Sequence, residues 1–276
     1  MTLSPETLQL ASMLDDQNHD VGLNVLARLL NKESEVGELS RLLQEHPNPL
    51  VRRRIHMLQN AFAMRRCRRK LCTMLQEQND PDIIGTLTSL HLLWFDKDNS
   101  GDIKRDVEKF IESAKNFPLN SLEDLEIFMR QNRFLPENET TTRPESYCIG
   151  TVIFHRLGAT STLMAIGSAL LDDDKKFQLV RVLGEFGIRD DAGMVLLGHG
   201  SWRLTALPEG CGVEIWSRAK MLRYIAMTLL SCAVNSDSYR YVMSLTRALT
   251  GDESSHVFDN FPYPYCAGPE NAEQLF

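Results

Sequence analysis

Residues 146–171 read SYCIGTVIFHRLGATSTLMAIGSALL, the longest apolar run of the chain that also has clear internal punctuation. Apolar residues recur at helical spacing on both sides of an interruption, namely Ile149, Val152, Ile153 and Leu157 before it and Leu163, Ile166 and Leu170 after it. The interruption ends at Gly158, a residue type that commonly stops a helix. The small polar residues that follow it can cap a second helix. The stretch therefore predicts helices over 146–157 and 159–171, joined at Gly158, with the second one buried.

The same stretch resembles the core segment of bacterial transglutaminase-like proteins of the SirB type. In that family an Asn-Ser-Tyr-Leu string precedes a helix, and an Arg-x-Gly-Ile-Pro-Ile-Ser-Leu string follows it. Ser146-Tyr147-Cys148 matches the first string, Arg156 and Gly158 match the turn, and Leu163 matches the helix after it. The resemblance covers about residues 83–250. It implies a transglutaminase-like core that is closed by a helical hairpin similar to a tetratricopeptide repeat.

The resemblance also implies where a catalytic triad would lie. Catalytic transglutaminases place a nucleophilic Cys at the start of the second helix, but no residue from Gly158 to Leu171 is Cys. The family's Gly-His-Phe string corresponds to Gly184-Glu185-Phe186, and its Asp-Pro string has no counterpart in 194–207. We therefore expect no catalytic residue, and we expect Glu185 to cap the second helix. The positions of the lost site would be Thr160, Ser161, Thr162 and Glu185.

The alternative is that the chain is an enzyme that uses another nucleophile, a Cys- or Ser-dependent acyl-transfer catalyst or hydrolase. The six cysteines form no Cys-x-x-Cys pair, which favours free thiols in a reducing compartment. Cys148 and His155 are seven residues apart, about 10 Å along a helix, which is beyond hydrogen-bond reach. Cys211 and His199 lie near each other in sequence, and contact between them stays open.

Composition is that of an ordinary globular protein, with 276 residues, 43% of them hydrophobic, and a net charge of −7. Residues 1–16 contain no signal-peptide pattern, and no run approaches the roughly 18 apolar residues of a membrane span. We expect a cytoplasmic protein with no cofactor whose partner is another protein. The acidic balance argues against a nucleic-acid partner.

Residues 1–80 are expected to be a helical region. Three apolar stripes with helical spacing occur before residue 46, and Pro47-Asn48-Pro49 opens a further helix. The string from Pro47 to Arg54 resembles the second half of a HEAT repeat. The region is therefore predicted to be a HEAT-like packing layer, although a solenoid needs several stacked units and one copy is visible.

The helix after Pro49 is strongly basic, with eight Arg or Lys residues between 52 and 70. One interpretation is a phosphate-binding face. The other is a solvated face opposite an ordinary apolar stripe, formed by Ile55, Leu58, Ala61 and Phe62. No aromatic residues alternate with the basic ones to stack on bases, so the second interpretation is favoured.

Residues 96–107 resemble an EF-hand loop. Oxygen-bearing residues occur at alternate positions, and Gly101 stands where the loop bends. The twelfth position should be a bidentate Glu but is Val107, which removes the strongest ligand. We therefore expect a polar loop between helices 83–95 and 104–116, with calcium binding as a further alternative. The candidate ligands would be Asp96, Asp98, Ser100 and Asp102.

The C-terminal half predicts a small antiparallel sheet and then helices. Residues 177–184 read as a strand that continues through Ile188, and shorter strands follow at 194–197 and 202–204. Residues 214–250 return to helix, and the proline-containing end reads as an irregular tail. The whole chain is thus predicted to be α+β and predominantly α-helical. Its regions would be 1–80, a transglutaminase-like core at 81–210, a helical hairpin at 211–250 and a tail at 251–276.

Overall fold

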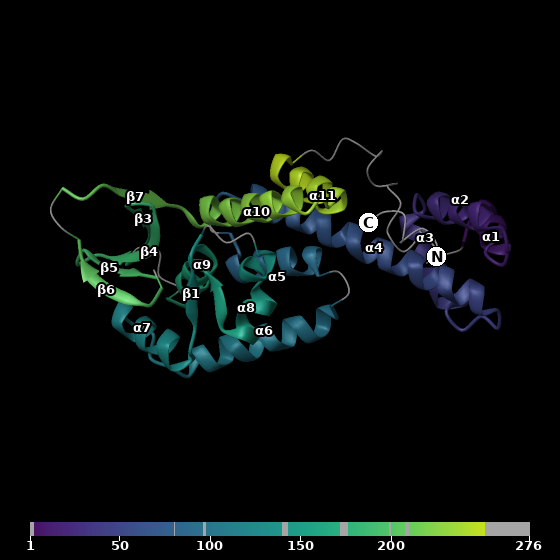
Figure 1. Ribbon diagram of the computed structural model, residues 1–276. Coiled ribbons are helices and arrows are strands. Elements are labelled where there is room, and N and C mark those ends of the chain that lie inside the picture. The colour runs from purple at the N-terminus through teal and green to yellow at the C-terminus, as the bar shows by residue number, and fades with distance from the viewer. Residues whose placement is uncertain are drawn as a thin grey trace. The chain divides into compact units, whose positions relative to one another are not determined.

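The computed structural model describes residues 3–79, 81–95, 98–139, 143–171, 176–198, 200–207 and 210–251. Most of them are helical, and a small antiparallel sheet accompanies the helices, which confirms the predicted fold class (Figure 1). The chain divides into two compact units, and the division falls between Cys67 and Arg68, inside one long helix. The predicted boundary at residue 80 falls after that helix, and the predicted tail, apart from Gly251, lies outside the described residues.

The first unit consists of α1 (Pro5–Ser12), α2 (His19–Leu29), α3 (Glu33–Leu43) and the first part of α4 (Pro49–Gln76). Side chains cap the first two helices, because Ser4 accepts a hydrogen bond from the Thr7 N–H and Asn18 accepts from two backbone N–H groups. The three predicted apolar stripes meet α4 in one core, which includes Leu14, Leu29, Val36, Leu39, Ile55 and Leu58.

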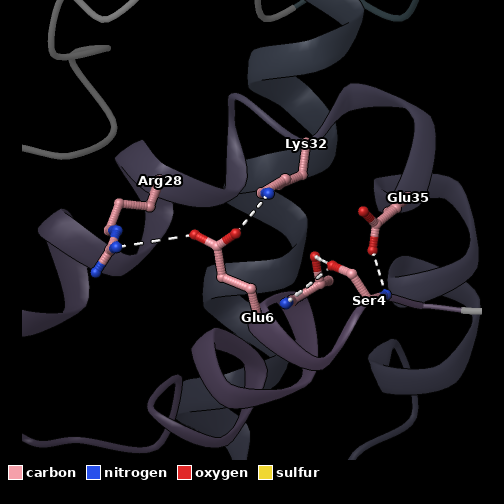
Figure 2. A network of polar contacts seen from close by, with 6 residues as sticks. Ser4, Glu6, Arg28, Lys32 and Glu35 are labelled. Atoms are coloured by element: carbon pink, nitrogen blue, oxygen red, sulfur yellow. Dashed lines mark hydrogen bonds and ion pairs between the residues drawn. The ribbon is translucent and has the colours of Figure 1, made fainter.

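Exposed hydrogen bonds and ion pairs connect the ends of these helices (Figure 2). The Glu6 carboxylate lies 2.6 Å from Lys32 Nζ and 3.8 Å from Arg28 Nη2, while Glu35 accepts a 2.7 Å hydrogen bond from the Ser4 N–H. The hydrogen bond from Lys32 lowers the pKa of Glu6, and the bond from the Ser4 backbone lowers that of Glu35. Exposed ion pairs of this kind contribute little to stability.

Two of the basic residues of α4 are buried instead of solvated. Arg54 is 6% exposed and donates to the carbonyl oxygens of Leu14 (3.0 Å) and Asp16 (2.7 Å). Arg65 is 4% exposed and donates to the carbonyl oxygen of Leu30. Helix ends leave carbonyls without partners inside the helix, and cationic side chains can satisfy them. These arginines therefore hold the first unit together, a role that neither interpretation of the basic helix included.

The second unit is built around α9 (Thr160–Leu171). This helix packs against α5 (Ile83–Trp94) and α10 (Arg218–Asn235), and also against β3 (Phe177–Val182) and β4 (Glu185–Asp190) (Figure 1). Nearly all of its residues are buried, so its apolar sequence has no polar face. The prediction of a buried helix is confirmed. The unit also contains α6 (Ser100–Lys115), α7 (Leu122–Gln131), the short helices η1 (Pro144–Tyr147) and α8 (Ile149–His155), and α11 (Tyr239–Thr250).

The junction before α9 differs from the prediction. Helix α8 ends at Arg156, which adopts the left-handed conformation with φ 59°, and Leu157–Ala159 form strand β2. This strand pairs in parallel with β1 (Leu135–Glu137). A Cβ at Gly158 would lie 2.8 Å from Val152 Cγ1. The glycine therefore permits close packing on α8, and the predicted turn at Gly158 is wrong because a strand runs through it.

The sheet also corrects two predictions. Its strand order is β6-β5-β4-β3-β7, with β5 (Met194–Leu197), β6 (Arg203–Ala206) and β7 (Val213–Trp216), and every pair is antiparallel. The predicted continuous strand over 177–188 is a hairpin, since Val182 pairs with Glu185 across a two-residue turn. The start of the predicted helix at 214 is an edge strand, and α10 begins at Arg218. No helix in the described ranges is long and apolar enough to cross a membrane.

Candidate functional site

The start of α9, where the resemblance implies a lost nucleophile, is buried. Ser161 and Thr162 are fully buried and Thr160 is 6% exposed. The Thr160 hydroxyl lies 3.0 Å from the carbonyl oxygens of both Glu137 and Gly198. The Thr162 hydroxyl has no hydrogen-bond partner among the described residues. None of these three hydroxyls is open to a substrate.

A carboxylate that the sequence did not predict occupies this helix start. Glu139 accepts hydrogen bonds from the Ser161 backbone N–H, from the Ser161 hydroxyl (3.1 Å) and from the Tyr224 hydroxyl (3.3 Å). The first N–H groups of a helix lack partners within it, and the helix dipole favours a negative charge there. Glu139 therefore caps α9, and it is Glu139 instead of the predicted Glu185 that contacts Ser161.

The electrostatics of this cluster are dominated by burial. Glu139 is half-buried, and its removal from water raises its pKa even though three hydrogen bonds to the carboxylate act in the opposite direction. Burial likewise raises the pKa of Tyr224 and of Tyr147, whose hydroxyl donates to the Glu139 carbonyl oxygen at 3.3 Å. The carboxylate thus accepts from one backbone N–H and two hydroxyls, the charge of Arg181 also acts on it, and no sulfur or imidazole of the described residues donates a hydrogen bond to it.

Glu185 itself begins β4, directly after the hairpin turn, and is half-buried. No sequence signal pointed to Glu139 in its place. Glu139 follows β1 and lies 22 residues before its partner Ser161. The two meet because β1 pairs with β2, which leads directly into α9.

The described residues of the EF-hand-like loop make hydrogen bonds and ion pairs with helices α5 and α6. The Asn99 side chain accepts from the N–H groups of Gly101 and Asp102, which caps α6, and Asp102 forms an exposed ion pair with Arg105. Ser100 is the first residue of α6. Asp96 lies outside the described residues. Within the described ranges, no three His, Cys, Asp or Glu side chains gather as a metal site would require.

A pocket of about 470 Å³ lies beside α5, α6 and α8 in the second unit. Its volume is typical of small-molecule sites. Its wall combines apolar residues with charged and titratable ones. The apolar residues include Ile103, Val107, Ile153 and Phe154. The charged and titratable residues include His91, Asp98, Asp106, His155 and Arg156.

His91 contributes an unused acceptor to this pocket. Its side chain is 2% exposed, and Nε2 lies 3.0 Å from Asp98 Oδ2. Burial lowers the pKa of His91 despite the neighbouring carboxylate, so the ring is neutral at neutral pH. Because Asp98 only accepts, the proton is on Nε2 and Nδ1 carries a lone pair. Nδ1 is buried and has no hydrogen-bond partner within the described chain.

Arg156 contributes an unpaired cation to the same pocket. Its guanidinium lies over the Phe134 ring at 4.7 Å and the Phe110 ring at 5.9 Å. Its Nη1 is buried without a hydrogen-bond partner among the described residues, and burial lowers its pKa. Its left-handed backbone is rare outside glycine, and such outliers gather at functional sites.

The thiols offer no comparable chemistry. Cys148, Cys211 and Cys232 are free thiols. Cys148 is fully buried, which raises its pKa well above the ordinary value, so it is a neutral thiol and a poor nucleophile. His199, the sequence neighbour considered for Cys211, lies outside the described residues.

Comparison of the chain with protein-family models, with curated proteins and with solved structures finds no significant match. The likeness to SirB-type proteins thus rests on the sequence patterns alone.

Proposed function

We propose that this chain is a non-catalytic transglutaminase-like protein of the cytoplasm and that it acts as a protein-interaction or scaffolding module. The observation that carries the proposal is the cap that Glu139 forms on α9. In the family that the sequence resembles, this helix start presents the nucleophile. Here the corresponding hydroxyls of Ser161 and Thr162 are fully buried, and a carboxylate engages the first of them.

Acyl transfer requires an accessible nucleophile beside a base that can take its proton. The Ser161 hydroxyl lies beside Glu139, but the carboxylate also holds the Ser161 N–H and the Tyr224 hydroxyl. It is thereby fixed as a cap. The buried, neutral Cys148 is no better placed to attack a substrate. These contacts favour a structural role for the region over a catalytic one.

A protein partner is supported by the β3–β4 hairpin. Its two-residue turn consists of Leu183 (φ 50°) and Gly184 (φ 90°), where Asn-Gly is the favoured pair. A left-handed leucine is disfavoured by about 1–2 kcal/mol. Leu183 is also 87% exposed, so it gains nothing from burial within this chain. An apolar side chain displayed in a strained conformation suits a contact with an apolar pocket on another protein.

The partner can be tested by placing a photo-crosslinking amino acid at position 183 in cells, with position 192 in the β4–β5 turn as the matched control. We expect one discrete protein to be captured from 183 and not from 192. The complex with that protein should then weaken in Leu183→Asn. Equal capture at both positions, or a complex unaffected by the substitution, would contradict the proposed contact.

The absence of catalysis can be tested separately with activated acyl esters and glutamine-containing peptides. We expect no turnover above background by the full chain. Turnover that disappears in Ser161→Ala or Cys148→Ala would contradict the proposal and support the acyl-transfer alternative.

A further inference from the structure

The pocket beside α5, α6 and α8 is lined by two residues with a buried polar atom that no described residue satisfies. Native structures leave few such groups without a partner, and each exception needs an explanation. The His91 Nδ1 atom is a neutral acceptor, and the Arg156 Nη1 atom is a cationic donor. Both residues line the same cavity, so one ligand can lie beside both side chains.

We propose that this pocket binds a small zwitterion with an apolar side chain, an α-amino acid or a short peptide. Its carboxylate is held by Arg156, and its ammonium group is held by His91 Nδ1 together with Asp106. The inference goes beyond the proposed interaction function and does not depend on it.

The carboxylate half of the site is pre-organised. Stacking on Phe134 restricts the plane of the Arg156 guanidinium, and the left-handed backbone sets the direction of its side chain. A guanidinium presents a fork of donors that matches the two oxygens of a carboxylate. No carboxylate of the described chain pairs with it, so a ligand carboxylate would not have to displace one.

The ammonium half follows from the acceptors on the pocket. The neutral His91 ring offers a lone pair, and Asp98 and Asp106 add negative charge. Asp106 has only an exposed 3.7 Å contact with Lys109, a pairing of little strength. The same two carboxylates disfavour a dianion such as phosphate, because like charges repel. One cation and several acceptors in one cavity therefore suit a ligand that carries both charges.

The side-chain preference follows from the wall. Ile103, Val107 and Ile153 line the pocket, and Phe154, which is 79% exposed, also lines it. An apolar ligand side chain would cover part of the Phe154 ring. Burial of apolar surface contributes roughly 25 cal/mol per Å², so a leucine-like side chain is favoured over a polar one.

Isothermal titration of the full chain with four probes tests the ligand class. The probes are L-leucine, leucyl-leucine, N-acetyl-L-leucine, which lacks the ammonium group, and L-leucinamide, which lacks the carboxylate. We expect saturable binding of leucine or leucyl-leucine, and at least about tenfold weaker binding of both blocked compounds, since a hydrogen bond to a charged group contributes about 1.5–3 kcal/mol. Which of the two zwitterions binds more tightly identifies the source of the ligand.

Matched variants test the residues. Arg133 is also left-handed, with φ 59°, but it is exposed and does not line the pocket. We expect Arg156→Met to weaken zwitterion binding at least about tenfold and Arg133→Met to leave it unchanged. Asp106 is exposed, so the Asp106→Asn variant should fold and keeps the proposal testable if Arg156→Met does not fold. It should weaken leucine binding while leaving N-acetyl-leucine binding unchanged.

Three results would overturn the inference: no saturable binding of either zwitterion, equal affinity of the two arginine variants, or N-acetyl-leucine binding as tightly as leucine. None of them affects crosslinking at position 183, so failure here is distinguishable from failure of the proposed interaction function.

Discussion

Two polar regions of the second unit differ in whether the described chain supplies the hydrogen-bond partners of their polar groups. At the start of α9, the half-buried carboxylate of Glu139 accepts hydrogen bonds from donors of the chain itself, Ser161 and Tyr224. In the pocket beside α5, α6 and α8, His91 Nδ1 and Arg156 Nη1 meet no partner in the described structure. The first arrangement has the signature of a structural element and the second that of a binding site. Residue type alone does not distinguish them.

Two arginines repeat this contrast. Arg54 is almost completely buried and donates to three backbone carbonyls, those of Leu14, Asp16 and Asn18. It lies so close to α2 that a Cβ at Gly22 would be 2.1 Å from its Nη2. Arg156 is half-buried and lies over aromatic rings, and its Nη1 has no acceptor among the residues that the structure describes. The first should therefore be needed for folding, and the second should be nearly dispensable for it.

The largest effect is expected for Arg54→Met. The change leaves the buried carbonyl of Leu14 and the half-buried carbonyl of Asp16 without their donor, and a buried group left unsatisfied costs about 1–3 kcal/mol. We expect the free energy of unfolding to fall by about 2–4 kcal/mol in chemical denaturation. A loss below about 1 kcal/mol would mean that water donates to these carbonyls in place of the guanidinium. Arg54 would then be no more important for folding than Arg156.

A smaller loss is expected for Glu139→Ala. It removes the cap of α9 and leaves the Ser161 N–H without its acceptor, which should destabilise the protein by about 1–3 kcal/mol. Amide hydrogen exchange provides a local readout, since the Ser161 amide should become less protected. Unchanged protection at Ser161 would show that Glu139 is not its acceptor in solution.

A gain in stability is expected for Leu183→Asn. Asparagine tolerates the left-handed conformation better than leucine and favours this type of turn, so the free energy of unfolding should rise by about 0.5–1 kcal/mol. Thermal unfolding of this variant beside Ala192→Ser, in the other hairpin turn, provides the comparison. A destabilised Leu183→Asn would show that the leucine packs within the chain, which would remove the reason to assign it a partner.

The smallest effect is expected for Arg156→Met. The substitution loses the cation–π contacts with the phenylalanine rings, which stabilise the fold by about 0.5–2 kcal/mol. It also removes the cost of holding a partly desolvated cation in the folded state, which acts in the opposite direction. The net change in unfolding free energy should be within about 1 kcal/mol. A loss as large as that of Arg54→Met would place Arg156 among the structural arginines and break the comparison.

The sequence predicted what depends on local spacing. The stripes of α1, α2 and α3 and the buried run of α9 follow directly from helical periodicity, because each helix buries its own apolar residues. The strand Val213–Trp216 has four residues, too few for periodicity to separate it from the helix that follows. Leu183-Gly184 lacks the Asn or Asp that usually marks a two-residue turn, so the hairpin was missed.

The candidate sites were less predictable because they depend on contacts between distant segments. Glu139 reaches Ser161 through the β1–β2 pairing, and His91 shares a pocket with Arg156, which is 65 positions later in the chain. The sequence placed Arg156 at the turn between two helices, but the position of its guanidinium over the Phe110 and Phe134 rings had no signal in the sequence. No spacing rule connects residues from separate elements in this way.

The most direct test of the account is the pH dependence of stability in the wild type and in Glu139→Gln. Burial raises the pKa of Glu139 in the folded state, so folding favours the protonated carboxyl. The stability contributed by that proton is fully present below the unfolded-state pKa of about 4.3 and is lost as pH rises through the folded-state pKa. Glutamine does not ionise, so the wild type should lose stability relative to Glu139→Gln as pH rises from the unfolded-state pKa of about 4.3 through the folded-state pKa. If the wild type instead gains stability relative to Glu139→Gln over this range, Glu139 is not the buried cap of α9 described here.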